Sequence, residues 1–168
     1  MDGVSEQGQE VVGQFLAGDR ALAGTLERLA EVAVEEIRGA DAASITVIRD
    51  GKPYTPAFTD RSAIEVDETQ YAEGDGPCLA AIRHSGIEEY QVGVDPRWPS
   101  VRSAAEANGV LGIFSVALQG EGNSAIGGLN LYSRTVPVFD AATRDQTVRL
   151  AVVIGIAVAN AIRYDEAA

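Results

Sequence analysis

The residues with the clearest capacity for chemistry lie in one stretch of the chain, from Asp67 to Gly86. It holds the only cysteine, Cys78, and the only histidine, His84. A thiol in the first turn of a helix lies at the positive end of the helix dipole, which favours the nucleophilic thiolate. Cys78 would also share a helical face with Ala81 and Ile82, and an apolar face is typical of a buried structural thiol. The sequence leaves the structural and the redox interpretation of Cys78 open.

His84 is poorly placed to activate this thiol. It follows Cys78 by six residues, which corresponds to about 120° around a helix, so the two cannot form a Cys-His dyad within one helix. We interpret His84 as an exposed bystander. One cysteine and one histidine also give no recognisable metal-ligand spacing, so no metal site is predicted and no cofactor is identified.

A sharp turn precedes the cysteine. Residues 73–76 read Glu-Gly-Asp-Gly, and their glycines allow the positive φ angles that a reversal needs. Pro77 fits the first position of a helix, where its missing N–H has no partner to lose. A short helix from Cys78 to Ser85 should follow, and Gly86 should end it. A loop and short helix of this kind can cover a sheet and form the wall of a pocket.

Three segments resemble the GAF sensory domain, in the form found in actinobacterial proteins. They are residues 70–83 (QYAEGDGPCLAAIR), 95–99 (DPRWP) and 127–133 (GGLNLYS). The resemblance implies a single α/β domain of the α+β kind over residues 19–168, preceded by an N-terminal extension at 1–18. It implies a central antiparallel sheet of about six strands, terminal helices on one face and a loop and short-helix pocket cover on the other.

The resemblance also implies a function: a regulatory domain that senses a small molecule or redox state and is not an enzyme. Related chains often continue into an RNA-binding ANTAR segment, which is absent here, so output is expected in trans through a partner protein. The signatures of cyclic-nucleotide-binding and bilin-attaching GAF domains do not match, and the ligand remains unidentified. Two alternatives stay open, a non-binding dimerisation or interaction module and a free methionine sulfoxide reductase. A single thiol cannot form the resolving disulfide of such a reductase alone.

The expected pocket residues are aromatic and apolar, with a few polar groups, as in most ligand cavities. Asn130 is an amide in the middle of a strong strand, and its hydrogen-bond sites need partners if it is buried. It could orient a ligand or bond a covering loop, and each aromatic residue could equally be ordinary core. Cys78 is also the redox candidate. The full set is Tyr71, Cys78, Leu79, Ile82, Trp98, Phe114, Asn130 and Tyr132.

Hydrophobic periodicity and turn residues predict the elements that must position these side chains. Strands are predicted at 43–49, 54–59, 87–92, 110–119 and 125–134. Helices are predicted at Asp19–Gly39, 97–107 and Asp140–Arg163, and residues 5–18 could form a further short helix. Alternate residues of the strand at 110–119 are apolar on both sides, so both faces of the sheet should be covered.

Composition limits the classes of partner. The chain has a net charge of −12 and a pI of about 4.4, which would repel nucleic-acid phosphates, so no direct nucleic-acid binding is expected. The polar, acidic N-terminus does not resemble a signal peptide, and a single cysteine excludes an intramolecular disulfide. A cytoplasmic location is expected. The longest apolar run, residues 150–159, is about half the length that spans a bilayer, so no membrane segment is predicted.

The C-terminal helix predicts a homodimer. Residues 150–159 read LAVVIGIAVA, which is apolar around the whole helix, so a monomer would leave one side exposed to water. Small residues spaced by four would let a second helix approach closely. Alternatively, they could pack on the protein's own sheet. The expected interface residues are Ala151, Val152, Gly155, Ile156 and Ala159.

Overall fold

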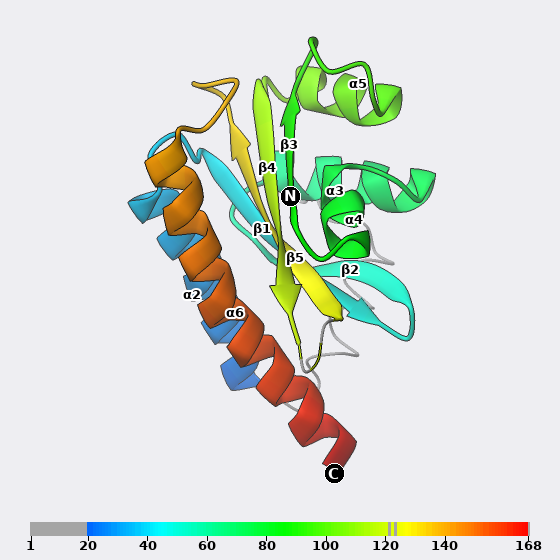
Figure 1. Ribbon diagram of the computed structural model, residues 1–168, viewed down its shortest axis with the longest axis vertical. Helices are drawn as coiled ribbons and strands as arrows, with labels where there is room; N and C mark the ends of the chain where they lie inside the picture. The colour runs from blue at the N-terminus through cyan, green and yellow to red at the C-terminus, as the bar shows by residue number, and fades with distance from the viewer. Residues whose placement is uncertain (1–19, 121, 123, 168) are drawn as a thin grey trace.

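The computed structural model describes residues 20–167 except 121 and 123, so the possible helix at 5–18 lies outside the described residues. Five antiparallel strands form one sheet in the order β2-β1-β5-β4-β3, close to the expected number of about six. The hairpin of β1 and β2 therefore pairs through β1 with β5 (Figure 1). The strands are β1 (Ala42–Arg49), β2 (Lys52–Phe58), β3 (Ile87–Gln91), β4 (Gly112–Gln119) and β5 (Ala125–Ser133).

Helices cover both faces of this sheet, as predicted. On one face, α2 and α6 run side by side in opposite directions, and α3, α4 and α5 lie on the other (Figure 1). The fold is therefore α+β with the expected two covering layers. The helices are α2 (Arg20–Glu36), α3 (Arg61–Glu73), α4 (Pro77–Arg83), α5 (Pro99–Ala107) and α6 (Ala141–Ala167).

The α2–α6 layer contains the larger apolar core. Ala151 and Ile154 of α6 are buried in it together with Leu26 of α2. A Cβ on Gly155 would lie only 3.1 Å from the backbone oxygen of Gln119, so this glycine lets α6 approach β4 closely. The small residues of α6 thus pack on the protein's own sheet, which corrects the dimer role predicted for Ala151 and Gly155.

The opposite side of α6 faces outward. Val152, Val153 and Ile156 are 59%, 52% and 58% exposed, whereas Ala159 is half-buried. By length and composition, residues Ala141–Ile162 could also cross a membrane. In the structure, this segment is the core helix of the domain on one side and an apolar surface on the other.

Helix α3 was not predicted from the sequence, although its ends carry clear signals. Asp60 caps its start, because the carboxylate oxygen Oδ1 accepts the backbone N–H of Ser62 at 2.9 Å. Gly74 ends it with φ of 74°, a left-handed conformation that glycine adopts without strain. The GAF-like cover is therefore a pair of helices, α3 and α4, joined by a tight turn, rather than a loop and one helix.

The other covering helices begin and end slightly differently from prediction. Helix α4 stops at Arg83, and Ser85 rather than Gly86 takes the positive φ that follows it. Helix α5 begins at Pro99, with Trp98 as its cap, rather than at Arg97. The reason is that Asp95 does not cap a helix, because its carboxylate binds the backbone N–H and the guanidinium of Arg97.

Candidate functional site

A group of enclosed polar side chains lies between the sheet and helices α3 and α4, and we call it the Asp67 cluster. Strands supply most of it, and α3 and α4 close it from above. So many polar groups inside a small domain are costly unless they bond one another or a ligand. The members are Ser44, Thr46, Thr55, Asp67, Gln70, Tyr71, Cys78, Ser115, Asn130 and Tyr132.

Asp67 is the charged centre of the cluster. Its carboxylate is fully buried and accepts hydrogen bonds from the hydroxyls of Thr55, at 2.9 Å, and Tyr132. Burial raises the pKa of Asp67 to about 6, although the hydrogen bonds from Tyr132, Ser44 and Thr55 act to lower it. In the described part of the chain it forms no ion pair, so its charge is balanced by hydroxyl groups alone.

A chain of hydroxyls connects Asp67 to Asn130 across the sheet. The Tyr71 hydroxyl lies 2.7 Å from the Thr55 hydroxyl and 2.7 Å from that of Thr46. Thr46 in turn accepts from the side-chain amide of Asn130, with Nδ2 and Oγ1 3.0 Å apart. The cluster is therefore one connected hydrogen-bond network rather than a set of separate pairs.

Cys78 is part of this network but is not activated by it. Its thiol is fully buried and donates to Thr46 Oγ1 at 3.4 Å. Burial first, and then the negative charge of Asp67, raise the pKa of Cys78 to about 12. The two effects outweigh the helix dipole, so Cys78 is a neutral thiol at physiological pH, which favours the structural over the redox interpretation.

We expect Cys78 to react slowly with a maleimide at neutral pH in the folded protein, because both access and thiolate are lacking. Since it is the only cysteine, the labelling rate needs no correction for other thiols. The same protein in denaturant, where the thiol is exposed, provides the matched control and should react rapidly. Comparable rates in the two states would show that the thiol is accessible and would revive the redox interpretation.

Several buried atoms in the cluster have no hydrogen-bond partner among the described residues. They are Gln70 Nε2, Asn130 Oδ1 and Ser115 Oγ, and all three residues are fully buried. Buried polar atoms in native proteins are nearly always bonded. These atoms are therefore the open hydrogen-bond positions of the cluster.

The remaining predicted pocket residues are only partly in this cluster. Ile82 Cδ1 lies 3.7 Å from the place where a Cβ on Gly128 would be, so it borders the cluster beside Cys78. Leu79 is half-buried on the same helix. Phe114 is misplaced in the prediction, because it points to the α2–α6 side, where its ring lies 5.9 Å from that of Phe139.

Trp98 is half-buried, as expected, but it packs in a second apolar cluster rather than among the polar residues of the Asp67 cluster. Its ring is 5.4 Å from that of Tyr90, in an apolar cluster formed by β3, α3 and α5. The two predicted covering elements do meet, since Ser100 at the start of α5 donates to the carboxylate of Glu73 at the end of α3. They form one continuous cover, and a hydrogen bond between the Trp98 and Asp75 side chains also joins the start of α5 to the α3–α4 turn.

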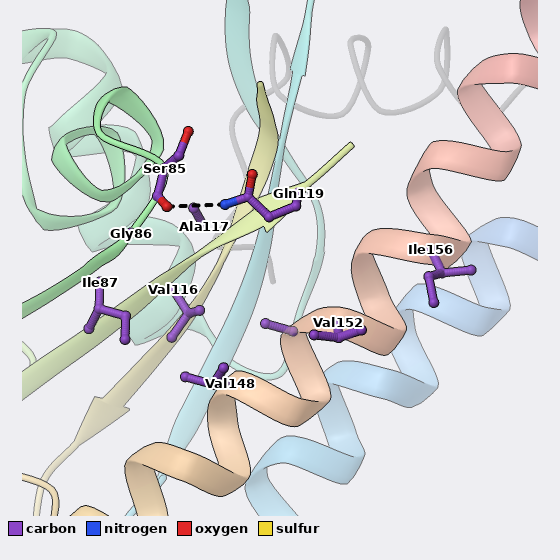
Figure 2. Close-up of a pocket in the computed structure, with 10 residues that line it drawn as sticks. Ser85, Gly86, Ile87, Val116, Ala117, Gln119, Val148, Val152 and Ile156 are labelled. Carbon is purple, nitrogen blue, oxygen red and sulfur yellow. Dashed lines mark hydrogen bonds between the residues drawn. The ribbon is translucent and has the colours of Figure 1, made fainter. Parts of the chain in front are cut away.

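A second feature is an apolar groove on the opposite face of the sheet (Figure 2). It has a volume of about 300 Å³ and runs between α6 and the edge formed by β3 and β4. Val152 and Ile156 form one wall, and Ile87 and Val116 lie across from them. At its end, Gln119 Nε2 donates to the backbone oxygen of Ser85 at 3.1 Å, which ties β4 to the segment after α4.

Sequence reasoning missed the other members of the cluster, which are Ser44, Thr46, Thr55, Asp67, Gln70 and Ser115. The available signal was that Ser44 and Thr46 lie on the same side of β1, each between residues that are buried and apolar. A strand of that kind in the centre of a sheet must present its polar side to something polar. The register that puts Ser44 opposite Asn130 could not be read from the chain itself.

Comparison with known proteins identifies the fold. A family model described as GAF domain matches residues 19–159. The GAF domain of a phosphoenolpyruvate-protein phosphotransferase from Coxiella burnetii is 16% identical, with a TM-score of 0.67 over 96% of this chain and 96% of that one. A GAF domain/HD domain protein from Geobacter sulfurreducens is 10% identical, with a TM-score of 0.62 over 89% of this chain and 97% of that one.

An enzyme is among the similar structures. A type II free methionine-R-sulfoxide reductase from Thermoplasma acidophilum is 18% identical, with a TM-score of 0.62 over 82% of this chain and 92% of that one. No curated protein sequence matches the chain. At these identities the likeness to solved structures shows the fold alone.

Proposed function

The chain belongs to the GAF domain family, and from that premise we propose that it senses a small molecule at the Asp67 cluster. Domains of this family are commonly sensory or regulatory modules of signalling proteins. The observation that carries the proposal is the set of buried, unpartnered atoms of Gln70, Ser115 and Asn130, in the same cluster as a carboxylate that forms no ion pair among the described residues. A purely structural core would gain stability by satisfying or removing them.

We favour ligand sensing over redox sensing and over catalysis. Cys78 is enclosed and its pKa is raised to about 12, so it is a poor nucleophile for either chemistry. The reductase reading rests on a shared fold, and fold alone does not carry activity. We therefore propose a non-catalytic role.

The signal would pass from the cover to the α6 face through hydrogen bonds at the end of α4. Ala117 N–H of β4 donates to the oxygen of Gly86 at 2.9 Å, next to the bond between Gln119 and Ser85. A ligand that shifts α4 would move these contacts, and β4 carries the floor of the α6 groove on its other face. A protein partner bound at that groove would then receive the signal.

Native mass spectrometry of the full chain purified from its host tests the sensing proposal. The wild type should retain extra mass, and Gly128→Val should not, because a Cβ there would already lie 3.0 Å from Cys78 Sγ and a larger side chain would fill the cluster. Gly24→Ala serves as the matched control, since nothing lies within 4 Å of its added Cβ. A wild type without extra mass, unaffected in stability by a small-molecule extract of the host, would contradict ligand sensing.

We also propose that the protein forms a homodimer through helix 140–163, with the contact residues revised by the structure. Val152, Val153 and Ile156 are large, apolar and exposed on one side of α6, and pairing with a second copy would remove them from water. A dimerisation module without a ligand is the second candidate function, and this surface favours it.

Light scattering at micromolar concentration should give about twice the chain mass of 17.6 kDa for the wild type. Ile156→Glu should give a monomer, because a charge on the paired face is desolvated without a partner. Val94→Glu is the control, since Val94 is equally apolar and 68% exposed but lies outside α6. A folded, monomeric wild type would rule out the dimer and with it the second candidate function.

A further inference from the structure

The hydrogen bonds of the Asp67 cluster have a direction that the carboxylate imposes. An ionised Asp67 carboxylate can only accept hydrogen bonds. Thr55 must therefore donate its single hydroxyl hydrogen to that carboxylate. Thr55 must then accept from Tyr71, and Tyr71 in turn must accept from Thr46. Each hydroxyl in the chain therefore donates its hydrogen bond to the next group in the direction of Asp67.

This direction fixes how Asn130 is oriented. The Thr46 hydroxyl donates its only hydrogen bond to Tyr71, so it can only accept a hydrogen bond from the Asn130 side chain. Asn130 must therefore turn Nδ2 toward Thr46. The amide oxygen Oδ1 then points away from Thr46 and remains without a partner among the described residues. The negative charge of Asp67 thus creates a free, buried acceptor at the other end of the chain.

The other open atoms add to this pattern. Gln70 Oε1 accepts the backbone N–H of Cys78 at 2.9 Å, which leaves its Nε2 as a free donor. Ser115 lies opposite Asn130 in the sheet, and its hydroxyl can donate or accept. A ligand that satisfies the cluster therefore needs at least one N–H or O–H for Asn130 and one acceptor for Gln70.

The charges in and around the cluster further limit the chemical class of the ligand. Within the described residues, the cluster contains no Lys, Arg or His, and the influences on Asp67 include the negative charge of Glu68 but no cation. Arg134, near the start of α3, is held by Asp60 and Ser62 instead. An anion placed here would be repelled by a buried carboxylate in a medium of low dielectric constant.

We propose that the ligand of the Asp67 cluster is a cationic nitrogen base, an amidinium, guanidinium or ammonium compound that donates an N–H to Asn130 Oδ1 and is attracted by the negative charge of Asp67. The proposal rests on the sensing function proposed above. A cation with several N–H groups would offset the charge of the carboxylate and donate to the free Asn130 oxygen, and a compound that also carries an acceptor would satisfy Gln70 Nε2. It would also lower the pKa of Asp67, because an adjacent positive charge stabilises the carboxylate.

Three small probes of the same shape test this class. Acetamidinium, acetamide and acetate carry charges of +1, 0 and −1, and each can be titrated into the full chain at neutral pH and constant ionic strength. Amide NMR signals of Gln70, Cys78 and Asn130 report binding at the cluster. We expect acetamidinium to bind at least about tenfold more tightly than either other probe.

Two variants identify the group responsible. Asp67→Asn should abolish the preference for acetamidinium, whereas Glu68→Gln, which removes the neighbouring acidic charge outside the cluster, should leave that preference nearly unchanged. Equal or tighter binding of acetate, retention of the preference in Asp67→Asn, or no response of the cluster signals to any probe would overturn the proposal.

The failure of the ligand class and the failure of sensing give different results. If the molecule retained by the host-purified protein is an anion that Gly128→Val loses, the class is wrong and sensing stands. If the wild type retains no molecule and is not stabilised by the host extract, the sensing function itself is wrong.

Discussion

Replacing Asp67 by asparagine should stabilise the protein at neutral pH. The pKa of Asp67 is raised to about 6 from an ordinary value of 3.8, so the folded state holds the carboxyl proton more tightly than the unfolded chain. At a pH below the pKa of Asp67 in the unfolded chain, the carboxyl group is protonated in both states and does not reduce the free energy of unfolding. As pH rises past the pKa of Asp67 in the folded state, the free energy of unfolding falls by its full amount, roughly 3 kcal/mol at most.

Asparagine removes the charge and keeps an acceptor for Thr55 or Tyr132, so we expect a net gain of about 1–3 kcal/mol at neutral pH. Urea unfolding between pH 4 and neutrality measures it, and the wild type should lose stability over that interval while the variant does not. An equal loss of stability at every pH would instead make Asp67 a structural acceptor.

Asp60 provides a control of opposite sign. Partial burial acts to raise its pKa, but hydrogen bonds from Ser62 and Arg134 outweigh this and lower it. Asp60→Asn should therefore destabilise the protein above the unfolded pKa and have least effect in acid. The opposite effects of the two substitutions on the free energy of unfolding distinguish Asp67, a carboxylate that lowers stability, from Asp60, a structural carboxylate that caps α3.

Gly76→Ala should cost far more stability than the neighbouring change Gly74→Ala. A Cβ on Gly76 would lie 2.3 Å from Gln70 Oε1 and 2.5 Å from its Cγ, so the Gln70 side chain would have to leave. Its bond to the Cys78 N–H, which holds the start of α4 against α3, would be lost with it. We expect a loss of about 2–4 kcal/mol and of ligand retention.

At Gly74 nothing lies within 4 Å of an added Cβ, and the residue has φ of 74°. Gly74→Ala should therefore cost only the strain of a left-handed residue, about 1–2 kcal/mol. Urea unfolding of both variants under the same conditions gives the comparison. Similar losses would mean that Gln70 does not hold the α3–α4 cover in place.

The sequence predicted the elements whose patterns are simple. The central strands β4 and β5 and the terminal helices are long, apolar and bounded by turn residues. Asp140 accepts the N–H of Thr143 at 2.8 Å and caps α6 as expected. Helix α3 was missed because its buried side carries Asp67 and Gln70, which interrupt the apolar periodicity that identifies a helix. The polar residues of the candidate site are thus the reason that the pattern of α3 does not indicate a helix.

The choice between two apolar faces could not be made from the chain. Phe114 and Ile113 are both fully buried, on opposite sides of β4, and only the contacts show which side faces the cluster. The same holds for α6, where Gly155 faces the sheet and Ile156 faces outward. Cys78 and Asn130 were found as candidates, but Asp67 becomes part of the site only through packing of α3 over the sheet.

Hydrogen exchange of the backbone amides tests ligand sensing at the Asp67 cluster most directly. The full chain would be measured with and without a small-molecule extract of its host, beside Gly128→Val as the variant with a filled cluster. We predict slower exchange from Gln70 to Ile82, including the Cys78 N–H held by Gln70, in the wild type alone. Unchanged exchange in α3 and α4, or protection confined to α6, would contradict it.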